Sequence, residues 1–136
     1  MNQKNRIKVV AINAFLMAAL FGLVTLNKEI LRPMSAGSNF LHVLTGCFPN
    51  FIAAYLISLA PAAAIFIRKP KHGRLIIYVS SIAVCILLII EELKPMWGAS
   101  TYYDPFDIMA SGLGALLAIV TFEIILSTRR TELDQR

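Results

Sequence analysis

The chain alternates between long apolar runs and short segments that contain charged residues, proline or glycine. Each apolar run is close to the ~20 residues that an α-helix needs to cross a bilayer, and none shows the alternation of a half-buried strand. The pattern predicts four membrane-spanning helices, over residues 9–26, 48–67, 75–93 and 107–126. Helices are expected because lipid offers no partner to an unpaired backbone group. The predicted fold class is an all-α, polytopic membrane protein, a single-domain four-helix bundle.

Composition supports a membrane protein. Of 136 residues, 57% are hydrophobic and 15% are charged, whereas a soluble domain has about 45–50% apolar and about 25% charged residues. The first apolar run follows Lys4, Arg6 and Lys8, as the core of a signal peptide would. However, the run is about 18 residues long, against about 7–15 in a signal peptide, and no small-residue cleavage site follows it directly. We therefore expect an uncleaved first helix.

The distribution of Lys and Arg predicts the orientation in the membrane. Ten basic residues share one side: Lys4, Arg6, Lys8, Arg68, Lys69, Lys71, Arg74, Arg129, Arg130 and Arg136. Three lie on the other side: Lys28, Arg32 and Lys94. The positive-inside rule then predicts cytoplasmic N- and C-termini in the inner (cell) membrane. The net charge of +5 follows from this topology, so it points to membrane lipids with anionic headgroups as partners and to no nucleic acid.

The segment before the second span is too apolar for a simple loop. Ser38 or Asn39 can cap a short helix over residues 39–47, and Pro49 then interrupts the backbone. Two arrangements fit: an interfacial helix followed by a span, or one long kinked helix. In either case His42 lies near the outer surface of the membrane.

The fourth span begins with typical helix-start chemistry. Asp104 suits the N-cap, Pro105 suits the first helical position, and Asp107 at the third position can bond back to free amide groups. The small residues Ala110, Gly114 and Ala118 follow at a spacing of four, which gives one helix face that a neighbouring helix can approach closely.

Topology places several polar residues at one membrane depth. Because the third and fourth spans form an antiparallel hairpin, Glu91 and Glu92 at the end of one lie level with Asp107 near the start of the other. The loop between them carries Trp97, Tyr102 and Tyr103, which are typical of a membrane interface. An outward-facing polar pocket is one hypothesis, with these ligand-binding residues: His42, Glu91, Glu92, Lys94 and Asp107. The alternative assigns each residue a separate role as a helix cap, a surface ion pair or an interfacial side chain.

Motifs for metal binding or catalysis are not evident. The chain has no HxxxH, HExxH or CxxC spacing and no G-x-S-x-G turn, and Cys47 and Cys85 are interpreted as packing residues. Glu123 is interpreted as a residue that pairs helices or extends to the membrane surface. No cofactor or metal is predicted, and a binding protein is favoured over an enzyme.

The stretch Ile89 to Val120, IIEELKPMWGASTYYDPFDIMASGLGALLAIV, resembles the second half of VanZ-like membrane proteins. In the resemblance Glu91 matches the family's acidic residue, Asp107 its aspartate and Gly114 its glycine, while SNFLH around His42 is similar to a segment before the second span. Lys94 replaces a glutamine and Ser111 an asparagine, and the family's loop arginine has no counterpart between Pro95 and Tyr103.

The resemblance implies a protein of the cell envelope, linked to tolerance of glycopeptide antibiotics such as teicoplanin. The ligands expected for the outward-facing pocket itself are a lipid headgroup, a cation or a lipid-linked or cell-wall precursor. Two alternatives stay open. One is a small membrane enzyme that acts on a lipid-linked substrate. The other is a structural or assembly subunit that forms a homo- or hetero-oligomer through the face of Ala110, Gly114 and Ala118.

Overall fold

The structure, a computed structural model, describes residues 3–94 and 104–134, which are almost entirely helical and contain no strand. The long helices are α1 (Gln3–Leu26), α3 (Asn39–Arg68), α4 (Gly73–Leu93) and α5 (Pro105–Asp134). Four helical segments are long and apolar enough to cross a membrane, which confirms the predicted all-α, four-span fold. Trp97, Tyr102 and Tyr103, and Arg136 of the charge count, lie outside the described residues.

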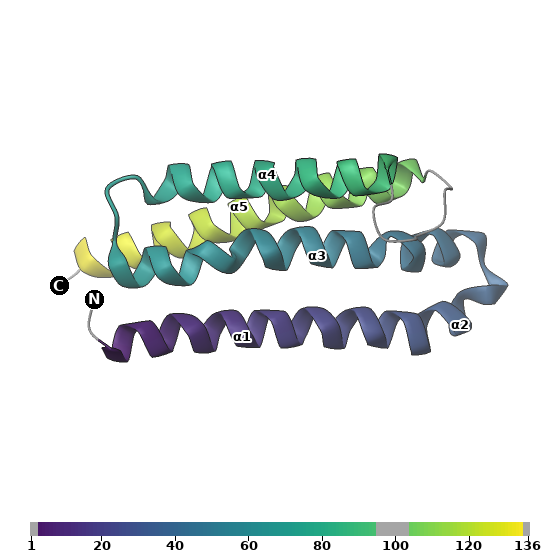
Figure 1. Cartoon of the computed structure of the whole chain (residues 1–136), viewed down its shortest axis with the longest axis horizontal. Helices are drawn as coiled ribbons and strands as arrows, with labels where there is room; N and C mark the ends of the chain where they lie inside the picture. The colour runs from purple at the N-terminus through teal and green to yellow at the C-terminus, as the bar shows by residue number, and fades with distance from the viewer. Residues whose placement is uncertain (1–2, 95–103, 135–136) are drawn as a thin grey trace.

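The four long helices run side by side in an up-and-down bundle (Figure 1). Helix α3 contacts each of the other three, α4 and α5 also contact each other, and α1 packs mainly on α3. One end of the bundle holds the start of α1, the α3–α4 turn and the end of α5, and we call it the terminal end. The opposite end holds residues 27–47, the end of α4 and the start of α5, and we call it the loop end.

The connection from α1 to α3 is helical, in keeping with the expectation that this segment is too apolar for a simple loop. It consists of a π-helical turn η1 (Asn27–Leu31), a short α2 (Arg32–Met34) and a 3₁₀ turn η2 (Ser35–Gly37). Helix α3 then begins with Ser38 as its N-cap residue, although the serine side chain makes no capping bond. Of the two predicted arrangements the structure has the single long helix, because residues 39–47 are the first turns of α3 and no separate interfacial helix forms there.

Helix α3 continues through Pro49 because other side chains satisfy the carbonyl that the proline leaves free. Pro49 has no N–H, so the carbonyl of Thr45, four residues earlier, lacks its helical partner. The side-chain amide of Asn27 donates to that oxygen at 2.8 Å, and Arg32 Nε donates to it at 3.4 Å. Arg32 also donates to the carbonyl of Gly46 at 3.0 Å. The α1–α3 connection is thereby fastened to the start of α3.

Helix α5 approaches α3 closely at Gly114. A Cβ at Gly114 would collide with the carbonyl oxygen of Phe51 and would lie 2.9 Å from the Cβ of Ala54, so only glycine permits this approach. Ala110 and Ala118 on the same face of α5 are buried too. The small-residue face is therefore occupied by α3 of the same chain, and an oligomeric partner would need another surface.

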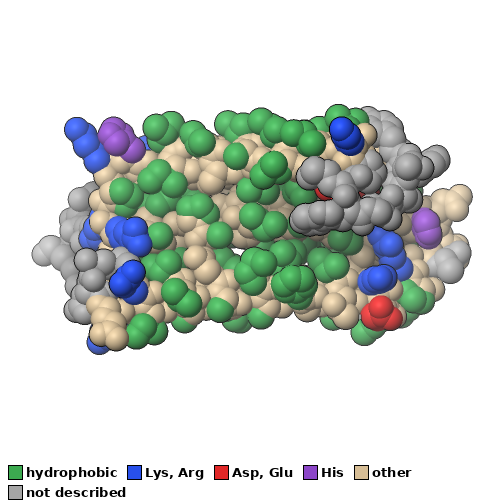
Figure 2. Space-filling model, viewed as in Figure 1, with side chains coloured by type: hydrophobic (Ala, Val, Ile, Leu, Met, Phe, Trp, Pro, Cys, Tyr) green, Lys and Arg blue, Asp and Glu red, His purple; other side chains and the backbone are tan. Residues whose placement is uncertain are grey.

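Apolar side chains cover the outside of the bundle between its two ends (Figure 2). Helix α1 is the extreme case, because Leu20 is its one buried residue. Such a surface would be insoluble in water, since a soluble monomer rarely exposes apolar patches beyond a few hundred Å². It suits lipid, which solvates apolar side chains all round a helix.

Candidate polar site at the loop end

Two carboxylates of the loop end account for the start of α5. Asp104 Oδ1 accepts a hydrogen bond of 2.9 Å from the backbone N–H of Phe106, as an N-cap side chain does. Glu92, from the last turn of α4, accepts a bond of 3.0 Å from the backbone N–H of Asp104. The second bond is the one that the capping arrangement would require of Asp107. Glu92 therefore replaces Asp107 in the cap and ties α4 to α5.

Asp107 is left with an incompletely satisfied carboxylate. Its backbone carbonyl accepts the Ser111 hydroxyl at 2.9 Å, and its side chain has a hydrogen-bond partner in the Asn50 amide of α3. The other carboxylate oxygen, Oδ1, is buried and has no hydrogen-bond partner among the described residues. An unpaired buried polar atom of this kind costs about 1–3 kcal/mol, and more if the group is charged.

The electrostatic surroundings of Asp107 are mixed. Glu92 and Asp104 lie close enough to repel its negative charge, and Arg32 lies close enough to attract it. Arg32 is already engaged with two backbone carbonyls of α3, so its charge acts from a distance and forms no ion pair with Asp107. The thiol of Cys47, almost one turn before Asn50, also lies within the field of both aspartates. We call Glu92, Asp104, Asp107, Asn50 and Arg32 the loop-end cluster.

The other predicted site residues stay outside this cluster. His42 is exposed, and its imidazole has no hydrogen bond or ion pair with a described residue. It precedes Asn50 by eight residues on α3, which is about 12 Å along the helix axis. Glu91 is half-buried and Lys94 is exposed, and within the described chain neither pairs with the other. Of the predicted set, the structure brings together Glu92 and Asp107.

Sequence reasoning missed the partners that α3 and the α1–α3 connection supply. The sequence held one indication that Asn50 matters: a polar amide next to a proline is unusual within an apolar span. Asn27 is fully buried, with one unpaired side-chain oxygen, and only its place at the end of the first apolar run marked it. Arg32 was recognised as a basic residue of this side, but its role follows from the carbonyl that Pro49 frees.

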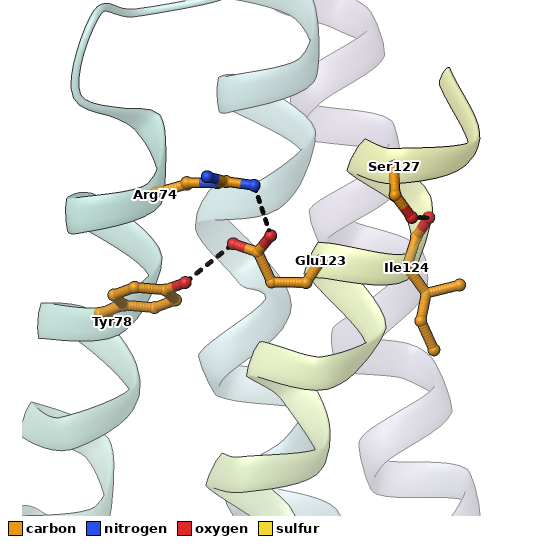
Figure 3. A network of polar contacts seen from close by, with 5 residues as sticks. All are labelled: Arg74, Tyr78, Glu123, Ile124 and Ser127. Atoms are coloured by element: carbon orange, nitrogen blue, oxygen red, sulfur yellow. Dashed lines mark hydrogen bonds and ion pairs between the residues drawn. The ribbon is translucent and has the colours of Figure 1, made fainter. Parts of the chain in front are cut away.

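A second carboxylate of α5 provides a contrast at the terminal end (Figure 3). Glu123 accepts a hydrogen bond of 2.8 Å from Arg74 and another of 2.8 Å from the Tyr78 hydroxyl, both from α4. Both of its oxygens are therefore paired. This arrangement matches the prediction that Glu123 pairs helices.

The chemistry available in the loop-end cluster is that of a hydrogen-bond acceptor. Within residues 3–94 and 104–134, no three His, Cys, Asp or Glu side chains are arranged to hold a metal ion. The carboxylates of Glu92, Asp104 and Asp107 accept hydrogen bonds when ionised. A protonated amine or another strong donor is the complementary group.

Comparison with models of known protein families, with curated proteins and with solved structures finds no match to this chain. The fold itself defines the class, a multi-pass α-helical membrane protein.

Proposed function

We propose that this multi-pass protein resides in the inner membrane with cytoplasmic termini, and that its loop-end cluster binds an envelope ligand from outside. The ligand carries a positively charged or hydrogen-bond-donating group, such as the amine of a lipid-linked or cell-wall precursor. In keeping with the VanZ-like resemblance, such binding underlies tolerance of a glycopeptide antibiotic.

The observation that carries the proposal is the buried, unpaired Oδ1 of Asp107. Buried polar atoms almost always have a partner, so each exception needs a physical reason. Capping does not supply the reason, because Asp104 and Glu92 already satisfy the amide groups at the start of α5. A donor on a ligand would pair Oδ1 and would also offset the repulsion from Glu92 and Asp104.

The distribution of charge between the two ends of the bundle supports an outward orientation of the loop end. The terminal end carries the larger group of Lys and Arg residues, which favours the cytoplasmic side for that end. The loop end then faces the cell wall, where precursors and glycopeptides are accessible.

The test compares the teicoplanin susceptibility of cells that express the chain with that of cells carrying an empty vector. We expect the wild-type chain to raise the inhibitory concentration, and Asp107→Asn and Glu92→Gln to abolish the increase. Glu29→Gln is the matched control, because Glu29 is an exposed acid of the same end. Membrane levels of all variants are measured by immunoblot.

Two results would count against the proposal in different ways. No increase with the wild-type chain would reject the link to glycopeptide tolerance. An increase that Asp107→Asn leaves intact, at equal membrane levels, would reject Asp107 as the binding group.

A further inference from the structure

The terminal end carries an exposed basic surface that the proposed function does not use. Basic residues come from two segments that the fold brings to the same end, the first turns of α1 and the α3–α4 turn (Figure 2). Their side chains are exposed: Lys4, Arg6, Lys8, Arg68, Lys69, Lys71 and Arg74. The one acidic side chain described near them, Glu123, is already paired with Arg74 and Tyr78. Within the described residues, no acidic side chain forms an ion pair with Arg6, Lys8, Lys69 or Lys71.

Lys69 adds a backbone observation. It ends α3 in the left-handed conformation, with φ 49° and ψ 53°, and its N–H donates to the carbonyl of Ile65 at 2.8 Å. Glycine is the usual residue at such a helix end, because a Cβ is unfavourable there. A lysine in this position costs backbone energy, and within the described residues its side chain makes no hydrogen bond or ion pair that offsets the cost. What lysine adds at this position, compared with glycine, is a side chain that ends in an exposed ammonium group.

We propose that the terminal end binds the phosphate groups of anionic phospholipids, through Lys69 and Lys71 of the α3–α4 turn together with Arg6 and Lys8 of α1. Three properties fit a lipid headgroup. The surface lies at the end of apolar helices, its charge is opposite to that of a phosphate, and α1 packs on α3 with both basic segments at the same end of the bundle. A phospholipid fits an apolar surface that ends in basic side chains, because its acyl chains lie along the helices while its headgroup meets the basic side chains.

The experiment measures lipid retention by native mass spectrometry of the full chain, released from micelles with equimolar phosphatidylglycerol and phosphatidylcholine. The test variant is Lys69→Gly with Lys71→Gln. The control is Lys28→Gln with Lys94→Gln, which removes the same charge from exposed lysines of the loop end. We expect the wild type and the control to prefer phosphatidylglycerol, and the test variant to lose roughly five-fold in that preference for each charge removed.

A second measurement separates lipid binding from folding. Lys69→Gly alone should unfold at the same temperature as the wild type or higher in neutral detergent, because glycine tolerates the left-handed conformation, while its phosphatidylglycerol preference falls. Two outcomes would overturn the proposal: equal retention of both lipids by the wild type, or equal loss of preference in the test and control variants.

Discussion

Two carboxylates of α5, Asp107 in its first turn and Glu123 further along toward the terminal end, have opposite surroundings. Glu123 at the terminal end has both oxygens paired, with Arg74 and Tyr78. Asp107, sixteen residues earlier and about 24 Å away along the helix, has one buried oxygen without a partner in the described chain and two acidic neighbours. The contacts of Glu123 join two helices and so explain its presence in the fold. The contacts of Asp107 within the described chain do not explain its buried oxygen in the same way.

The difference separates a structural acid from a candidate binding acid. Charged groups near lipid are costly, so they usually pair with another side chain or line a functional site. Glu123 is paired with other side chains, because α4 supplies a cation and a hydroxyl at the same depth. At the loop end the available cation, Arg32, is held by the carbonyls of Thr45 and Gly46, so it forms no ion pair with Asp107.

The largest expected effect comes from separating α5 from α3, because the two helices are in close contact at Gly114. Gly114→Val would force a side chain into the backbone of Phe51 and the Cβ of Ala54. We expect a loss of about 1–3 kcal/mol in the free energy of unfolding, measured by SDS titration from dodecyl maltoside micelles.

The matched control is Gly22→Val in α1, where a Cβ meets no atom within 4 Å. It should change the free energy of unfolding by less than about 0.5 kcal/mol. Equal destabilisation by the two variants would mean that the close approach of α5 to α3 does not limit stability.

An intermediate effect is expected at Glu123. Glu123→Ala removes two hydrogen bonds to a charged group and should cost about 1–2 kcal/mol. In a double-mutant cycle with Arg74→Ala, the coupling energy should be about 0.5–1 kcal/mol, since the Arg74 side chain is 52% exposed and that of Glu123 is 30% exposed. A coupling energy near zero would show that the ion pair does not join α4 to α5.

A smaller effect distinguishes the two aspartates of the loop end. Asp104→Ala removes the acceptor of the Phe106 N–H and should destabilise the protein by about 1 kcal/mol. Asp104→Asn keeps a capping oxygen and should stay within about 0.5 kcal/mol of the wild type. If Asp104→Ala has no effect on stability, Asp104 is not the group that caps α5, and Asp107 becomes the candidate for the capping role.

The helices were predictable because hydrophobic runs of bilayer length leave little choice of structure. The four runs gave the spans, and Asp104 with Pro105 gave the start of α5. The sequence left open whether one helix continues through Pro49. It does, because Asn27 and Arg32 compensate for Pro49 through contacts between segments far apart in sequence. Local rules for proline describe one helix at a time, so they gave no indication of this compensation.

The membrane depth of the candidate site was predictable from the sequence, but the contacts of its side chains were not. The hairpin topology placed Glu91, Glu92 and Asp107 at one level, yet it did not decide which glutamate turns toward α5. That choice depends on the rotation of α4 about its axis, which packing against α3 and α5 sets. The structure selects Glu92, and it adds Asn50 from a helix that the hairpin argument did not include.

The central claim is that Glu123 stabilises the fold and Asp107 does not. The most direct measurement is the free energy of unfolding of Asp107→Asn beside that of Glu123→Gln, both isosteric changes on α5, in the same SDS titration. We predict a loss of about 1 kcal/mol for Glu123→Gln. For Asp107→Asn we predict a change within about 0.5 kcal/mol, because relief from acidic neighbours offsets the lost attraction to the helix N-terminus. An equal or larger loss for Asp107→Asn would contradict the account.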